Sequence, residues 1–283
     1  MVIQEFLVIL HPYLTKVKHL PVRKLYLILL LALLVCLGCQ WHLTPSEQQE
    51  EEVQVEIERF DRAERLYLTT GDFAALQQMK TVYPSETRTL IEDMLQLGRV
   101  DEPDINTRFL LFFQDSTLQT LMLDVEDQYH DVSDLNHELS MAFDNLTQLL
   151  PHLEVPRIYT QIGSLDQSIV VGDSMVGISL DKYLGADHPV YLKYGYTEEQ
   201  RRMMTRQYIV PDCLGFYLLG HYPMTEEERD SFELRDAHMA RIQYVVNKAM
   251  GRNVFSRQPV LQVADSLASH PELTIEDLLL EKR

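Results

Sequence analysis

Apolar residues recur at helical spacing along the chain from Val53 to Pro151. Between residues 133 and 150, one helix face carries a row of apolar side chains: Leu135, Leu139, Ala142, Leu146 and Leu149. Ser133 is a candidate N-cap for this helix, and Pro151 stops it. The same periodicity predicts earlier helices near residues 60–68, 73–79, 90–97, 105–115 and 117–130.

The pattern changes after Pro156 to short runs that are rich in Ile and Val. These runs cover residues 157–162, 168–171 and 175–180. Gly163 and the trio Gly172-Asp173-Ser174 are turn signals between them. We therefore expect three antiparallel strands.

Helices resume after these strands. Thr197 and Gln200 form one capping-box signature, and Thr225 and Glu228 form another. Pro211 should break or kink the first of these helices. The chain has 46% apolar residues, which is enough for a sizeable core. The expected fold class is α+β: a mainly helical single domain over residues 53–283, with a small antiparallel sheet near 157–180.

The residues before this domain carry a different pattern. Positions 25–38 hold no charged side chain, a run too short to span about 30 Å of hydrocarbon but typical of a signal-peptide core. The run ends at Leu37-Gly38-Cys39 and resembles the lipobox of bacterial lipoproteins, in which the cysteine is acylated and the preceding peptide is removed. We predict a signal peptide over 1–38, lipidation of Cys39 and an acidic tether over 39–52. An uncleaved N-terminal anchor or a buried core helix is the alternative.

Charge narrows the range of partners. The whole chain has a formal net charge of −18, and the residues after the predicted signal peptide hold 21 basic and 42 acidic side chains. So acidic a surface repels phosphate backbones, which excludes nucleic-acid binding. It also disfavours electrostatic attraction to an acidic membrane, so the membrane is expected as a partner only through the lipid anchor.

Several motifs resemble one known family. They are ISLDKYLG at 178–185, YIVPD at 208–212, IERFD at 57–61 and Tyr83-Pro84. These motifs, and their order along the chain, resemble the gliding-motility lipoprotein GldB of Bacteroidota, over roughly residues 53–250. The resemblance implies an envelope lipoprotein that serves gliding or surface-protein secretion through envelope protein partners, with no established enzymatic chemistry. It implies a membrane of the cell envelope, with the outer membrane favoured over the inner, and a fold related to the zinc metallopeptidases.

That relation makes a metallopeptidase-like hydrolase the main alternative, and a small-molecule-binding lipoprotein is another. A zinc peptidase of this type needs His-Glu-x-x-His on one helix face. Residues 203–220, where that helix is expected, contain neither His nor Glu. The nearest match, His137-Glu138-Leu139-Ser140-Met141, lacks the second ligand, and we expect His137 to be an exposed helix residue.

Other candidate sites also have structural interpretations. Gly172-Asp173-Ser174-Met175-Val176-Gly177 misses the nucleophile-elbow spacing by one residue and is better explained as a hairpin turn. His188, His221 and His238 could in principle converge with Asp181, Asp187 or Asp212, but their spacing does not show it. We therefore predict no catalytic residues, no metal site and no cofactor.

A partner surface is the functional interpretation of the 178–196 region. Its candidate residues are Asp181, Tyr183, His188, Tyr191 and Tyr194, because rings with polar tips are favoured at interfaces. The alternative is that these rings close the core between sheet and helices. For Asp212, which follows Pro211, we expect a place in the first turn of a helix, where the dipole favours a carboxylate.

Lipidation of Cys39 is directly testable. Replacing Cys39 with Ala should release the chain from the membrane fraction or leave the precursor unprocessed, because the acylated sulfur is lost. Cell fractionation with mass spectrometry of the mature chain measures both. An unprocessed mass and membrane attachment in both the wild type and the variant would indicate an uncleaved anchor instead.

Overall fold

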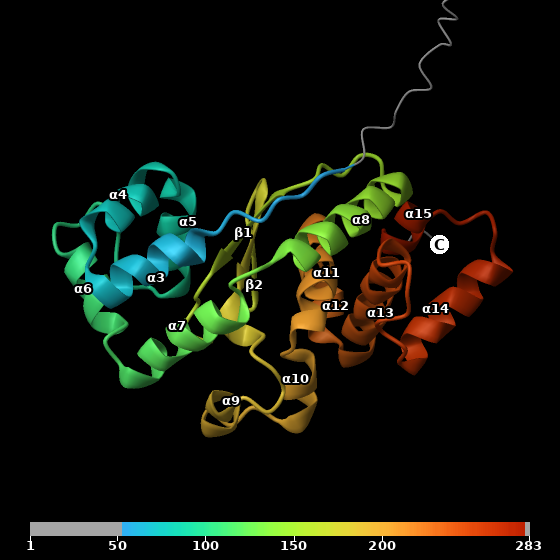
Figure 1. Ribbon diagram of the computed structural model, residues 1–283. Coiled ribbons are helices and arrows are strands. Elements are labelled where there is room, and N and C mark those ends of the chain that lie inside the picture. Colours follow the sequence, from blue (N-terminus) through green and yellow to red (C-terminus); the bar gives the residue numbers. More distant parts are fainter. Residues whose placement is uncertain (1–52, 281–283) are drawn as a thin grey trace, which may run out of the picture. The chain divides into compact units, whose positions relative to one another are not determined.

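A computed structural model describes residues 53–280, and Cys39 with the predicted signal peptide and tether lies outside them. The described residues are mainly helical with one small sheet, so the predicted α+β class is confirmed (Figure 1). The elements before the sheet are α3 (Phe60–Thr70), α4 (Phe73–Thr81), α5 (Pro84–Arg88), the π-helical turn η2 (Thr89–Met94), α6 (Ile105–Phe112), α7 (Ser116–Gln128) and α8 (Ser133–Leu149).

Local signals explain where several of these helices begin and end. Gly71 adopts φ +70° and closes α3, and the side chain of Asp72 then accepts the N–H of Ala75 to start α4. The predicted cap of α8 is wrong by one residue, because Val132 holds the cap position. Ser133 is already helical, and Asp131 accepts its N–H at 2.9 Å.

The sheet has the strand order β1-β3-β2. Its strands are β1 (Arg157–Gln161), β2 (Ile169–Val171) and β3 (Met175–Ser179), close to the three predicted runs. β2 and β3 form the expected antiparallel hairpin, in which the N–H of Gly172 donates to the carbonyl of Met175 at 2.8 Å. β1, however, pairs with β3 in parallel, so the prediction of an entirely antiparallel sheet is wrong.

The loop between β1 and β2 explains this difference. Residues 162–168 reverse the chain and carry it past one strand position, which leaves a gap that β3 fills. Alternation of apolar residues marks a strand but does not specify its neighbour, so this order was not evident from the pattern.

The second group of helices follows the sheet. Its elements are the 3-10 turn η3 (Leu180–Lys182), α9 (Pro189–Lys193), α10 (Glu198–Met203), the 3-10 turn η4 (Arg206–Tyr208), α11 (Ile209–His221), α12 (Glu226–Asp230), α13 (Phe232–Ala249), α14 (Gln258–Ser269) and α15 (Ile275–Leu279). Both predicted capping boxes are present, at Thr197 and Thr225. The helix that starts after Thr197 stops before Pro211, which lies in the first turn of α11.

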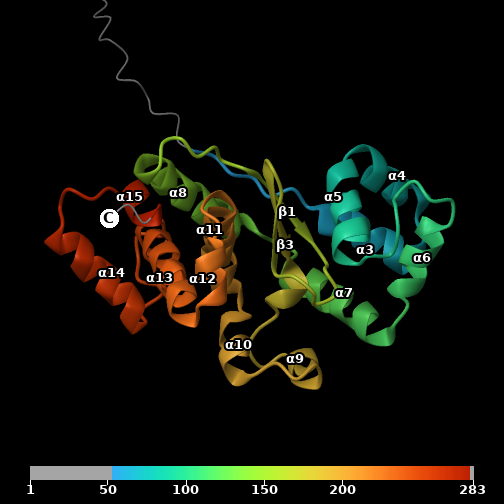
Figure 2. The same ribbon diagram turned by 180° about the vertical axis from the view of Figure 1, so that it is seen from behind.

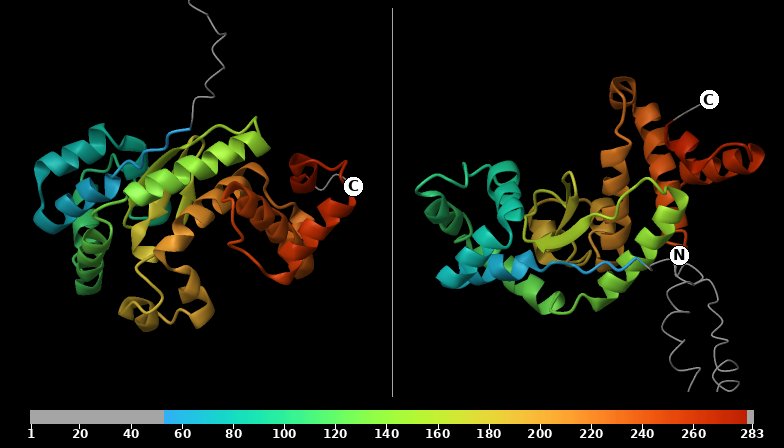
Figure 3. Two further views of the ribbon diagram at one scale, coloured as in Figure 1. Left: turned by 45° about the vertical axis from the view of Figure 1, so that its right-hand side comes forward. Right: turned by 90° about the horizontal axis from the view of Figure 1, so that it is seen from above.

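The sheet lies between two groups of helices. β1 contacts α3, whereas β2 and β3 contact α11, and α8 packs on α11 and α13 (Figures 2 and 3). α14 packs on α13 and follows the part of the chain that carries the recognised motifs. Cys213 is buried on α11 as a free thiol. Among residues 53–280, no helix is both long enough and apolar enough to cross a membrane.

The first described residues run as an extended segment along β1. The N–H of Glu58 donates to Ile158, and its carbonyl accepts from Thr160, at 2.9 and 3.0 Å. Two side chains of α8 complete the attachment, because Ser140 and Asn136 accept the N–H groups of Val55 and Ile57. The start of the domain is therefore bound to both the sheet and α8.

Gly177, in the central strand, offers a test of this packing. It pairs with Tyr159, and a Cβ at position 177 would lie 2.5 Å from the hydroxyl and Cζ of that buried ring. Gly177→Ala should therefore lower the free energy of unfolding by about 1–3 kcal/mol, measured by chemical denaturation.

Gly215→Ala is the matched control for that substitution. Gly215 lies in α11, and the nearest atom to its added Cβ is Val246 Cγ2 at 3.9 Å. Alanine should stabilise this helix by roughly 0.5–1 kcal/mol. Equal stability of the Gly177→Ala variant and the wild type would contradict the close packing of Tyr159 over the sheet.

Candidate functional site

Asp181, in the ISLDKYLG motif, binds the turn that follows β1. Its side chain is fully buried in η3, and its two carboxylate oxygens accept the N–H groups of Gly163 at 2.8 Å and Leu165 at 2.5 Å. In this turn Ser164 and Leu165 have φ of 57° and 63°, a region that costs residues with a side chain about 1–3 kcal/mol each. The two hydrogen bonds that Asp181 accepts hold the turn in that conformation.

Two tyrosines bind the backbone at and beside Asp181. The hydroxyl of Tyr191 donates to the carbonyl of Asp181 at 2.7 Å and accepts the N–H of Leu184 at 2.8 Å. The hydroxyl of Tyr129 donates to the carbonyl of Tyr183 at 2.5 Å. These bonds connect the end of β3 with α7 and α9, so the rings close the core at this point.

Tyr183 joins the two recognised motifs to each other. Its hydroxyl donates to Oδ2 of Asp212 at 2.8 Å, and Asp212 lies in the first turn of α11, as expected. Enclosure of this carboxyl raises the pKa of Asp212 to about 7, although the hydrogen bond from Tyr183 acts in the opposite direction.

The structure corrects part of the predicted partner surface. Asp181, Tyr183 and Tyr191 are buried, and their polar groups form hydrogen bonds inside the domain. His188 is largely buried, and its Nε2 lies 3.1 Å from Asp124. Only Tyr194 is well exposed, at 55%. Partner binding through the exposed part of this region stays a prediction.

The sequence reasoning missed a buried carboxylate next to this motif. Glu64, on α3, is fully buried, and its Oε2 accepts the N–H of Ile162 at 2.9 Å. Burial raises the pKa of Glu64 well above its usual value, and the nearby carboxyls of Asp181 and Asp61 raise it further. Burial also raises the pKa of Asp181. The signal in the sequence was an acidic residue on the apolar side of a helix, which periodicity alone treats as exposed.

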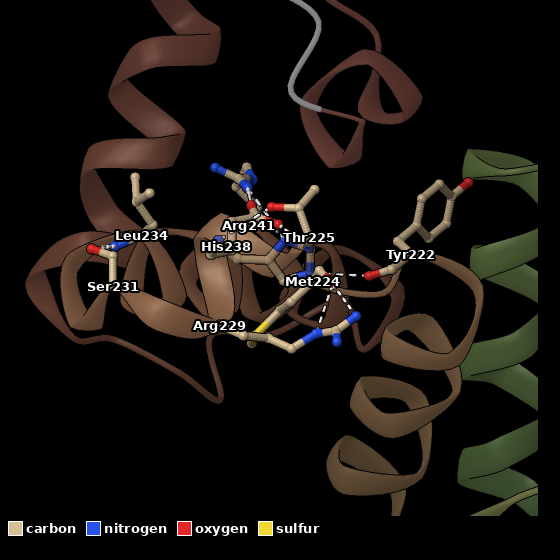
Figure 4. Close-up of polar contacts among 9 residues, drawn as sticks. Tyr222, Met224, Thr225, Arg229, Ser231, Leu234, His238 and Arg241 are labelled. Atoms are coloured by element: carbon tan, nitrogen blue, oxygen red, sulfur yellow. Dashed lines mark hydrogen bonds and ion pairs between the residues drawn. The ribbon is translucent and has the colours of Figure 1, made fainter.

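A second polar cluster connects the last helices. Oε1 of Glu228 lies 3.1 Å from Nδ1 of His238 and accepts a hydrogen bond from Arg241 at 2.7 Å. Nε2 of His238 lies 3.0 Å from the carbonyl of Tyr222 (Figure 4). Both ring nitrogens of His238 face oxygen acceptors inside the domain, so this histidine joins α12, α13 and the turn after α11.

The candidate histidines and aspartates do not converge. His188 contacts Asp124 and His238 contacts Glu228, whereas the ring of His221 packs edge-on against Tyr217. His137 is exposed on α8, as expected. Within residues 53–280, no cluster of three or more His, Cys, Asp or Glu side chains could hold a metal ion.

Tyrosines also fix an exposed segment to the motif. Residues 189–203 comprise α9 and α10, which project from the rest of the domain at the bottom of Figure 1. Tyr196 anchors this segment, because its hydroxyl donates to the carbonyl of Leu165 at 3.0 Å. Three apolar side chains of the α9–α10 segment remain exposed: Leu192 at 57%, Tyr194 at 55% and Met203 at 45%.

Comparison with known proteins gives one match. Residues 42–251 match the sequence model of a family described as gliding motility protein GldB. No curated protein and no solved structure matches the chain, so the expected relation to zinc metallopeptidases stays a prediction.

The buried Glu64 predicts an unusual dependence of stability on pH. Above its ordinary pKa of 4.5 the unfolded chain loses this proton while the folded chain retains it, so stability falls as pH rises towards the folded pKa. Glu64→Gln should therefore stabilise the domain more at pH 8 than at pH 4. Between the unfolded and the folded pKa, the one proton that only the folded chain retains changes the free energy of unfolding by about 1.4 kcal/mol per pH unit.

Denaturation at several pH values measures this difference. Asp173→Asn, in the exposed hairpin turn, is the matched control and should keep the wild-type profile. If Glu64→Gln also keeps that profile, Glu64 is ionised in the folded domain.

Proposed function

The chain belongs to the family of gliding motility protein GldB, and from this premise we propose that it acts by binding other envelope proteins rather than by catalysis. In this proposal the chain is anchored through a lipid on Cys39, to the outer membrane rather than the inner, and it serves gliding or surface-protein secretion. The family name supports an envelope lipoprotein connected with gliding motility.

The use of the motif residues supports a binding function. Asp181, Tyr183 and Tyr191 direct their polar groups to partners within the domain. A substrate has no access to a buried group that is already hydrogen-bonded, so these residues are suited to building the domain. In this proposal, such a domain acts through the surface segment that the motif holds in place.

The α9–α10 segment is the surface that we assign to the partner. It carries Leu192, Tyr194 and Met203 as exposed apolar side chains, and this is the observation on which the proposal depends. Rings and methionine are favoured at the centres of protein interfaces. The anchoring bonds of Tyr191 and Tyr196 hold the segment in place before a partner binds, which lowers the entropic cost of association.

The proposal predicts a specific loss of partners. Leu192→Ser combined with Tyr194→Ser should abolish cross-linking of the full chain to envelope proteins in cells, because the exposed apolar area is removed. Thermal unfolding should change little, since both side chains are exposed. Cross-linking followed by mass spectrometry, with unfolding measured in parallel, provides both readouts.

Two controls define the result. Phe232→Ser removes a side chain that is 75% exposed at the start of α13 and should leave cross-linking unchanged. Tyr191→Ala should lower the unfolding temperature, because this ring is buried. Wild-type cross-linking in the Leu192 and Tyr194 double variant would place the binding surface elsewhere.

A further inference from the structure

The IERFD motif continues into a series of arginines that the function above does not use. Arg59, Arg62 and Arg65 are spaced three residues apart at the start of α3. They lie beside a pocket of about 320 Å³ where α3 meets α7. The pocket is lined by Arg59, Asp61, Arg62, Arg65, Leu66, Val125, Glu126 and His130.

Two of these arginines have carboxylate partners. Nε and Nη2 of Arg59 donate to Asp61 at 2.8 and 2.7 Å, and Nη2 of Arg65 lies 2.5 Å from Glu126. Arg62 instead donates to the carbonyl of His130 at 2.7 Å, and no carboxylate of residues 53–280 pairs with it. The pocket therefore has one guanidinium charge in excess, in a domain in which acidic side chains far outnumber basic ones.

Two further features favour an anion. Nη1 of Arg59 is enclosed and has no hydrogen-bond acceptor in the described part of the chain. The N-terminus of α3 also borders the pocket, and no side chain caps it, so the helix dipole adds positive partial charge there.

We propose that this pocket binds the carboxylate of an organic monoanion. A single negative charge balances the unpaired Arg62, whereas a dianionic phosphate would leave one charge uncompensated. The planar guanidinium group matches a carboxylate with two hydrogen bonds. Leu66 and Val125 form an aliphatic wall, which favours a ligand with an apolar part next to its carboxylate. This site is separate from the α9–α10 segment and does not rest on the proposed function.

Calorimetric titration of the full chain in a non-ionic detergent tests the ligand class. Hexanoate should bind, whereas hexanol, which lacks the charge, and inorganic phosphate should bind at least about tenfold more weakly. Phosphate binding equal to or tighter than hexanoate binding would overturn the assignment to a monocarboxylate. Absence of hexanoate binding would overturn the site itself.

Three variants locate the binding. Arg62→Gln should weaken hexanoate binding about tenfold, because a charged hydrogen bond is lost. Glu126→Gln should strengthen it, since this change removes a competing carboxylate, and a folding defect could not produce that gain. Arg99→Gln changes an exposed arginine outside the pocket and should leave the affinity unchanged. Equal affinities in the wild type, Arg62→Gln and Glu126→Gln would refute the pocket.

The same titration distinguishes two sources of the carboxylate, a free carboxylic acid and the C-terminus of a peptide. A short peptide that ends in leucine with a free carboxyl group should bind like hexanoate if the site recognises a chain end, and its C-terminal amide should not. Binding of hexanoate without the peptide supports a free carboxylic acid. Binding of the amide as tightly as the free peptide would contradict recognition of the carboxylate.

Discussion

A buried carboxylate needs hydrogen-bond donors in place of the water molecules that it loses. For Asp181 these donors are two backbone N–H groups. This constraint determines the turn after β1, because the donors belong to Gly163 and Leu165. The conformation of this turn determines where β2 begins. It therefore also determines on which side of β1 the neighbouring position stays free for β3. The parallel pairing of β1 with β3 therefore depends on a side chain that comes after all three strands.

Buried acidic side chains lie on both sides of the sheet, but their hydrogen-bond and ion-pair partners differ. Glu228 forms an ion pair with Arg241. Burial alone would raise the pKa of Glu228, but the N–H of Thr225 and the nearby His238 hold it below its usual value. Within residues 53–280, Glu64 forms no ion pair and accepts one backbone N–H, so burial favours its protonated form. A chain with many acidic residues thus uses some of them as internal connectors, in charged form at one place and in neutral form at another.

The sequence was informative where a signal is local. Capping boxes, the Gly172 turn and the stop before Pro211 depend on a few adjacent residues, and the structure contains them. Strand order was not predictable, because Asp181 acts on a turn 16 to 18 residues earlier. The candidate surface failed in part for a related reason. Aromatic residues with hydroxyl groups suit both an interface and a core, and only the positions of acceptors such as Asp212 distinguish the two.

The extended segment at residues 53–58 has a mechanical consequence. Its bonds to Ile158, Thr160, Asn136 and Ser140 follow one another along the chain, and α3 begins immediately after them. A force applied to the chain ahead of Val53 along the direction of this segment would be shared among these bonds instead of acting on them one at a time. The sheet and α8 would then take up the load together, before any helix had to unwind.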